Sequence, residues 1–358
     1  MLFAALCLTA TLSMPAADQV LDLGARIQPL PAANRFGEAG FHVWCGSPLR
    51  TADGRYHLYY SRWPIEATFH PGWAIFSEVA YAVADRPEGP YRHVNVALPS
   101  RGQQFWDGSV THNPTVVQVG NRFALFYTGN VGNGLYTDHR NHQRVGVALA
   151  DRPEGPWTRL DQPIVDVSED PTAFDALCTT NPAACVMPDG RILVHYKAVA
   201  KEPGKVMGGA VRYGAAIADR VEGPYRKVPS KIFLPPAGGD GKHWMVAEDS
   251  FIWYSARYGN RYYAVARDVL GLFSGSAGGI ALFQSQDGLD WVPAPNPKVL
   301  DGRYPLEGGG VSKTRLERPM VLCQDGEPVL LFGAADGYRK DGAGSANVQF
   351  PIRALTPP

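Results

Sequence analysis

Apolar residues along this chain occur in short runs, and turn sequences rich in glycine, proline and aspartate separate the runs. Within many runs, apolar and polar positions alternate. This pattern is typical of β-strands joined by tight turns, and no long stretch shows the apolar periodicity of a helix. Pairs of runs joined by a short glycine-containing turn, as in 114–127, predict β-hairpins. The sequence therefore predicts an all-β fold.

The runs repeat along the chain in units of similar length. Each unit has a marker position in its first strand, an aromatic second strand, and a third strand that ends in a turn such as Asp-Arg-Pro-Glu-Gly-Pro-Trp at 151–157. The aromatic residue of that turn opens a fourth strand. The markers lie 66, 68, 68 and 69 residues apart, at Pro48, Pro114, Pro182, Ser250 and Pro319. Five units of four antiparallel strands predict a five-bladed β-propeller, forming one domain over residues 18–358.

The fifth unit lacks a fourth strand of its own. After Phe332 only one further strand is predicted, around 347–355, and no glycine-proline turn follows it. The apolar segment Val20–Ile27 precedes the first unit and belongs to none. We therefore predict that this segment supplies the outer strand of the last blade and closes the ring, which would protect an open sheet edge.

The charge balance excludes several classes of partner. The chain has 34 basic and 34 acidic residues, and no run of lysine or arginine offers a track for phosphates or anionic lipids. Neither nucleic acid nor a membrane surface is therefore expected as a partner, and a monomer is expected.

The N-terminal segment indicates the cellular location. Residues 1–17 are apolar, carry no charge before Asp18, and end in the small residues Pro15-Ala16-Ala17. This is typical of a signal peptide, although the basic start of such peptides is missing. The expectation is export to the periplasm or the extracellular space. Four cysteines remain after cleavage, without the Cys-x-x-Cys spacing of zinc sites, and buried free thiols are favoured over disulfides: Cys45, Cys178, Cys185 and Cys323.

Propeller topology predicts where a site lies. The starts of the innermost strands and the ends of the second strands converge on one face around the central axis, and the connections 64–77, 131–143, 200–211, 269–278 and 337–346 leave from that face. The residues expected to bind a ligand there are Trp44, Trp63, His112, Asn113, Asn181, Lys197, His243, Arg267 and Arg318. The carboxyls expected there are Asp107, Asp175, Glu248, Asp249 and Glu317. No metal ligand set is predicted.

This combination of residues suits carbohydrate chemistry. Aromatic faces stack on sugars, and two carboxyls can divide the acid and base roles across a glycosidic bond. Glu248 is predicted to be the proton donor, because the preceding apolar residues and the adjacent Asp249 would raise its pKa. Asp175 is the first choice for its partner and Asp107 the second. The alternatives are that each Asp only accepts backbone hydrogen bonds and that Glu248 only binds a sugar hydroxyl.

The five units, the Asp-x-Pro-Glu-Gly-Pro turns and the position of Glu248 resemble the five-bladed propeller glycoside hydrolases of families 43 and 117. The resemblance implies an exo-acting hydrolase of plant or algal oligosaccharides, with Glu248 at the place of the family 43 general acid. Ser47 and Asn181 stand where that family has two aspartates, which implies a neighbouring family. The base is then one of Asp175, Asp107, Asp249 and Glu317.

Two other functions fit the sequence. A propeller without the family base would only bind carbohydrate. A glycoside phosphorylase is the second, because Lys197, Arg267 and Arg318 could hold phosphate. No cofactor is expected, and an axial calcium ion is left open. The distance between the two carboxyls would decide between inversion and retention.

Overall fold

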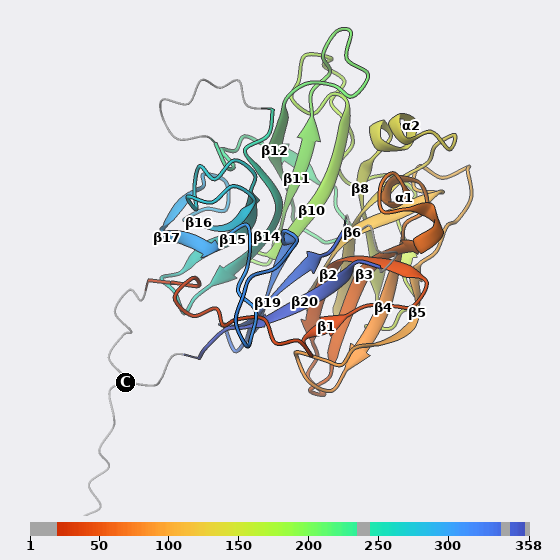
Figure 1. The fold of residues 1–358 in the computed structure, drawn as a ribbon. Coiled ribbons are helices and arrows are strands. Elements are labelled where there is room, and N and C mark those ends of the chain that lie inside the picture. Colours follow the sequence, from red (N-terminus) through yellow and green to blue (C-terminus); the bar gives the residue numbers. More distant parts are fainter. Residues whose placement is uncertain (1–19, 235–243, 338–343, 355–358) are drawn as a thin grey trace, which may run out of the picture.

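The computed structural model describes residues 20–234, 244–337 and 344–354, and it is a β-propeller (Figure 1). Five sheets of four antiparallel strands surround a central axis, as the repeat predicts. The innermost strands β2, β6, β10, β14 and β18 contact one another in this order, and β18 contacts β2 to complete the ring. The predicted fold class is confirmed.

The first three blades are continuous in sequence. They consist of β2 (Phe41–Arg50), β3 (Tyr56–Pro64), β4 (Glu78–Ala84) and β5 (Arg92–Leu98); β6 (Val110–Val119), β7 (Arg122–Asn130), β8 (Arg144–Ala150) and β9 (Thr158–Arg159); and β10 (Cys178–Val186), β11 (Ile192–Val199), β12 (Val211–Ala218) and β13 (Arg226–Val228). The fourth blade consists of β14 (Ala247–Ser255), β15 (Arg261–Asp268), β16 (Gly279–Ser285) and β17 (Val292–Leu300).

The fifth blade combines the two ends of the described chain. It consists of β18 (Glu317–Gln324), β19 (Glu327–Ala335), β20 (Ala346–Pro351) and β1 (Arg35–Phe36). The predicted outer strand Val20–Ile27 is not formed, since only Ile27 makes a bridge, to Ile352. The apolar side chains of that segment, Leu21 and Leu23, are instead buried in the core between blades 4 and 5. Their packing, and not strand pairing, explains the apolar run.

The hydrophobic core is divided among the interfaces between blades. Each pair of neighbouring blades encloses a cluster of buried side chains, to which the aromatic second strands contribute strongly. Tyr59, Phe126 and Phe332 are examples with no exposed surface. Burial at about 25 cal/mol per Å² of apolar surface makes these interfaces the main stabilising contribution to the ring.

Three short helices interrupt the connections on one face: η1 (Ile65–Ala67), α1 (Gly72–Ile75) and α2 (Tyr136–Asn141). Figure 1 shows α1 and α2 side by side, and the two helices are in contact. Over the described ranges, no helix has the length and apolar character needed to span a membrane. The thiols of Cys45, Cys178 and Cys185 are buried, and none of the four described cysteines forms a disulfide.

The closing strand β1 offers a test of how the ring is held together. The Phe36 ring is buried and packs edge-on against Tyr60 of blade 1, with ring centroids 4.9 Å apart. Phe36→Ala is expected to lower the free energy of unfolding by about 3 kcal/mol, because it leaves a cavity between blades 5 and 1. Thermal or denaturant unfolding measures this loss. The control Val20→Ala changes a half-exposed residue and should shift stability by less than about 0.5 kcal/mol, and equal effects would contradict the assignment.

Candidate active site

A cavity of ≈ 560 Å³ opens on the central axis, on the face that carries the three helices. All five innermost strands or the segments next to them contribute to its lining. Connections from 64–77, 131–143, 200–211 and 337–346 form part of its walls, as predicted. The predicted connection 269–278 contributes no described lining residue, whereas 301–316, between blades 4 and 5, contributes three: Arg303, Thr314 and Arg315.

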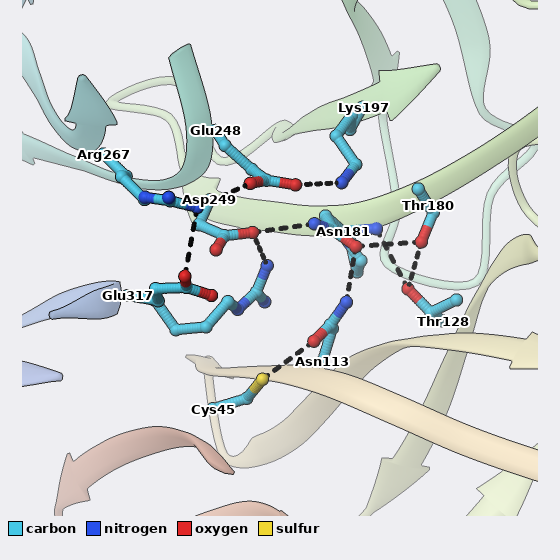
Figure 2. A network of polar contacts seen from close by, with 12 residues as sticks. Cys45, Asn113, Thr128, Thr180, Asn181, Lys197, Glu248, Asp249, Arg267 and Glu317 are labelled. Carbon is cyan, nitrogen blue, oxygen red and sulfur yellow. Dashed lines mark hydrogen bonds and ion pairs between the residues drawn. The ribbon is translucent and has the colours of Figure 1, made fainter. Parts of the chain in front are cut away.

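One residue from each blade belongs to a central ring of polar side chains, and Figure 2 labels four of them: Cys45, Asn113, Asn181 and Asp249. Arg318 is the fifth, and all of the five except Cys45 line the cavity. The five are linked in order, because Cys45 Sγ donates to Asn113 Oδ1 at 2.8 Å, Asn113 donates to Asn181, and Asn181 Nδ2 donates to Asp249 Oδ1 at 2.8 Å. Arg318 Nη1 donates to the same Asp249 oxygen at 2.8 Å. All five residues have a positive φ between 48° and 60°. Such backbone conformations are costly outside glycine and concentrate at functional sites.

The positive φ values mark a β-bulge at the same place in each innermost strand. In blade 1 the bulge lies between Trp44 and Ser47, so the residue equivalent to Asn113 is Cys45. The residue of blade 1 that corresponds to the marker Pro114 is therefore Gly46. The marker Pro48 predicted from the sequence is two residues too late. A bulge re-aims side chains, and here it lets the residue before each ring member line the cavity. These residues are Trp44, His112, Thr180, Glu248 and Glu317.

Two carboxylates on neighbouring blades share one guanidinium group. Arg267 Nη1 lies 3.2 Å from Glu248 Oε2 and 3.1 Å from Glu317 Oε1. Lys197 Nζ lies 2.6 Å from the other oxygen of Glu248. Lys197 and Arg267 come from the second strands β11 and β15, where Arg267 is directly opposite Glu248 in the sheet. Cross-strand pairing thus places Arg267 beside Glu248, while Glu317 and Lys197 reach the same group of charges from the blades on either side.

The electrostatics distinguish the two acids. Burial raises the pKa of Glu317 to about 7, and the nearby negative charges of Glu248 and Asp249 act in the same direction, against the opposing effect of Arg267. Glu248 instead has ion pairs with both Lys197 and Arg267. Burial therefore favours the protonated form of Glu317, whereas two cations face the carboxylate of Glu248.

The ring itself is neutralised internally. Burial alone would raise the pKa of Asp249, but Arg318, Lys197 and Arg267 together lower it, so Asp249 is an ionised partner of Arg318. Burial raises the pKa of the Cys45 thiol to about 12 and lowers the pKa of His112 to about 3. Both of these groups are therefore neutral at physiological pH, and His112 bonds Ser77 Oγ at 2.7 Å through Nδ1.

Aromatic side chains form one wall of the cavity. Trp44 packs against Phe69 with ring centroids 4.8 Å apart, and Trp73 packs against Tyr136 at 5.9 Å. All four line the cavity. Partly exposed aromatic faces, such as those of Trp73 and Tyr136, in the same cavity as a carboxylate pair provide a surface on which a sugar ring can stack.

Several predicted site residues lie elsewhere. Asp107 is fully buried and is held by Arg101, Arg159 and the Tyr127 hydroxyl. Asp175 is bound by Lys227 at 2.6 Å and by Tyr196.

Both aspartates occupy the turn that precedes an innermost strand, so they fix that turn and do not line the cavity. Trp63 is also fully buried, behind Phe69, and His243 lies outside the described residues. Trp44, His112, Asn113, Asn181, Lys197, Arg267 and Arg318 do line the cavity.

The residues of the central ring do not fit a calcium ion. Calcium takes six to eight oxygen ligands, usually with several carboxylates. In the ring, Asp249 is the one acid and it is paired with Arg318, whose Nε and Nη2 lack a partner among the described residues. These N–H groups of Arg318 would donate hydrogen bonds to an acceptor, whereas the positive charge of the guanidinium would repel a cation. No group of three potential acidic, histidine or cysteine ligands occurs in the described part of the chain.

Known structures share this architecture. No profile of a known protein family and no curated protein sequence matches the chain. It is similar in structure to Zg3597, a family 117 glycoside hydrolase of the marine bacterium Zobellia galactanivorans, with 18% identity, 91% of this chain and 89% of the other covered, and a TM-score of 0.61. A complex of BT0996 with RGII gives 14% identity, coverage of 93% and 94%, and a TM-score of 0.63.

A third similar structure is CoXyl43, a family 43 β-xylosidase/α-arabinofuranosidase from a compost metagenome, in complex with xylotriose. It gives 14% identity, coverage of 91% and 93%, and a TM-score of 0.58. Similarity over nearly the whole length of both proteins establishes that this protein has the fold of the five-bladed propeller glycoside hydrolases. At this level of identity the match concerns the fold, and the chemistry has to be argued from the cavity.

The raised pKa of Glu317 predicts how stability depends on pH. Folding lifts this pKa from 4.5 to about 7, so between these values the folded state binds a proton that the unfolded state does not. The stabilisation from Glu317 is therefore complete below pH 4.5 and is lost as pH rises to about 7. Glu317→Gln lacks this loss, so its stability relative to the original protein should increase by about 3 kcal/mol over that interval. Denaturant unfolding across pH measures the difference, and a difference independent of pH would contradict it.

Proposed function

We propose that this protein is an exported, exo-acting glycoside hydrolase of plant or algal oligosaccharides. The observation that carries the proposal is the pair Glu248 and Glu317, which share Arg267 in a cavity with an aromatic wall. Cleavage of a glycosidic bond needs one protonated and one ionised carboxyl within reach of the same bond. The similarity of fold to family 43 and family 117 glycoside hydrolases supports the same class.

Glu317 is the proton donor in this proposal. A pKa of about 7 keeps a large share of the carboxyl protonated near neutral pH, while leaving it acidic enough to give up its proton to the leaving oxygen. Once the proton has been given up, Arg267 stabilises the resulting carboxylate. Arg267 is thus a positioning residue that contacts both acids.

Glu248 is the nucleophile. Its two oxygens bond Lys197 and Arg267, which hold the carboxylate in one orientation. Arg267 Nη1 lies 3.2 Å from one oxygen of Glu248 and 3.1 Å from one oxygen of Glu317. The distance between these two oxygens therefore cannot exceed the sum of the two values. This limit concerns one oxygen of each carboxyl; it lies just below the range of about 6.5–9.5 Å that leaves room for an attacking water in inverting enzymes, and it includes the separation of about 5–5.5 Å found in retaining enzymes. The geometry favours attack by Glu248 on the sugar and a retaining mechanism.

The shape of the cavity supports exo action. Four of the five ring side chains line it on the central axis, and connections from several blades form walls around it. A pocket of this kind accepts the end of an oligosaccharide, whereas an open cleft would let a chain pass through. Export rests on the apolar, uncharged residues 1–17 that precede Asp18.

The alternative functions have less support. A partly buried carboxyl with a pKa of about 7 reduces the stability of the fold near neutral pH, and a binding module without catalysis gains nothing in return. For phosphorolysis, the three cations suggested as a phosphate site are already paired with acids: Lys197 with Glu248, Arg267 with both glutamates, and Arg318 with Asp249. Cleavage is therefore expected to proceed without phosphate.

The roles of the two acids predict that the loss of activity depends on the leaving group for one variant and not for the other. On an oligosaccharide, Glu317→Gln should lower kcat by about 10²–10⁴-fold, because the leaving oxygen needs its proton. On an aryl glycoside with a nitrophenolate leaving group the loss should be much smaller. Glu248→Gln should lower kcat by a similar factor on both substrates, because attack on the sugar fails in each case.

The substrate for these assays would come from a panel of aryl glycosides and of plant and algal oligosaccharides. Asp175→Asn is the matched control, since Asp175 is a carboxyl outside the cavity that binds Lys227. It should not change the dependence on the leaving group. If Asp175→Asn abolished turnover while Glu317→Gln retained it, the assignment would be wrong and Asp175 would regain its place as a catalytic candidate.

The short separation of the carboxyls predicts the stereochemistry of the product. NMR spectra recorded during the first turnovers, before the free sugar mutarotates, should show the same anomeric configuration as in the substrate. Glu248→Gly should lose this activity and regain cleavage when azide is added, because azide can take the place of the missing nucleophile. Formation of the opposite anomer would show that water attacks directly and would remove Glu248 from the nucleophile role.

A further inference from the structure

The cavity carries an excess of positive charge although the chain as a whole is neutral. Its lining contains three acids, Glu248, Asp249 and Glu317, and six cationic side chains: Arg140, Lys197, Arg267, Arg303, Arg315 and Arg318. Lys197, Arg267 and Arg318 have ion pairs with the three acids. No ion pair is found in the described residues for the other three arginines. Their charge is available to a ligand.

Arg303 and Arg315 lie at the two ends of one folded segment. Ser312 ties this segment together, because its backbone N–H donates to Tyr304 O at 2.9 Å and its hydroxyl donates to Thr314 O at 2.7 Å. Arg303 Nη1 also donates to Ser312 O at 3.2 Å. The segment leads directly into β18 and Glu317. Both arginines line the cavity, and Arg315 lies two residues before the proposed proton donor in the sequence.

None of the acids in or beside this segment forms an ion pair with Arg303 or Arg315. Glu307, within the segment, is exposed and has no ion pair among the described residues. Asp301, at its start, has an ion pair with Lys298 at 2.7 Å. Asp336 accepts a hydrogen bond from Thr314 at 2.7 Å and has an ion pair with Arg35 at 2.7 Å. Neither carboxylate pairs with Arg303 or Arg315, so the positive charge of this wall is not neutralised by them.

We propose that the sugar bound in this cavity carries an acidic substituent, a carboxylate or a sulfate ester, which Arg303 and Arg315 bind. Guanidinium groups match the planar or tetrahedral oxygens of such groups with two parallel hydrogen bonds, which lysine cannot make. The aromatic wall of Trp44 and Trp73 accepts the apolar face of the same sugar. This inference rests on the proposed function for the identity of the ligand as a sugar, and it adds the class of substrate.

Direct binding to the Glu317→Gln protein tests the inference without requiring turnover. The probes are matched pairs: galacturonic acid against galactose, glucuronic acid against glucose, and galactose 6-sulfate against galactose, with inorganic phosphate as a separate probe. Calorimetry or thermal shift should show that at least one acidic sugar binds about tenfold more tightly than its neutral counterpart, as expected for charge-assisted hydrogen bonds. The uronic acids and the sulfated sugar distinguish the two sources of charge.

The double substitution Arg303→Gln and Arg315→Gln should remove this preference and leave binding of the neutral sugar unchanged. Both side chains are exposed, so the variant is expected to fold, and its melting temperature checks this. The control Arg50→Gln removes one exposed charge at the far end of β2, away from the cavity, and should keep the preference. Added salt at about 0.5 M should weaken the acidic probes selectively, because exposed charges are screened.

The inference is overturned if acidic and neutral sugars bind equally, if no acidic sugar binds, or if the preference survives the double substitution. It is also overturned if inorganic phosphate binds these arginines as tightly as any acidic sugar. Acidic sugars that bind through Arg303 and Arg315 without cleavage of any glycoside would uphold the inference and contradict the hydrolase. Cleavage of neutral glycosides with no preference for acidic ones would do the reverse.

Discussion

The buried ion pair between Asp249 and Arg318 is the interaction on which the centre of this propeller depends. The two residues come from blades 4 and 5, and Asp249 also accepts a hydrogen bond from Asn181 of blade 3. Blades 1 and 2 join the same series of contacts through Cys45 and Asn113. A buried pair of this kind gives little net stability, because desolvation of both charges offsets their attraction. Breaking it would be costly, however, because one charge would remain buried and unpaired.

This central pair also sets the conditions for the chemistry above it. Asp249 adds a fixed negative charge beneath Glu317, while Arg267 and Lys197 bind the carboxylate of Glu248. Two glutamates of the same type thereby have different electrostatic surroundings, although each directly precedes a ring residue in its own blade. The difference comes from the second strands, which place two cations beside Glu248 and one beside Glu317. Such a division of roles between like residues is typical of sites that transfer protons.

The local signals of the sequence account for most of the fold and for part of the site. Alternating runs and glycine-proline turns predicted the strands, because they depend on residues close in sequence. The prediction of a strand around Leu21 and Leu23 is wrong, because side chains buried between two blades and side chains buried by a strand produce the same apolar run in the sequence. Asp107 and Asp175 are carboxyls near the right strands, but their partners come from other elements. The contact of Glu248 and Glu317 through Arg267 joins residues up to 69 positions apart, and no local pattern reports it.

The composite fifth blade has a consequence for how the protein is made. Its outer strand lies at residues 35–36, and the strand with which it pairs lies at 346–351. Four blades can form in order as the chain emerges from the ribosome, but the fifth sheet and the last interface must wait until almost the whole chain has been synthesised. Contacts across such a long sequence separation form slowly. Until then the ring is open, and the cavity lacks Glu317 and Arg318, which the fifth blade supplies.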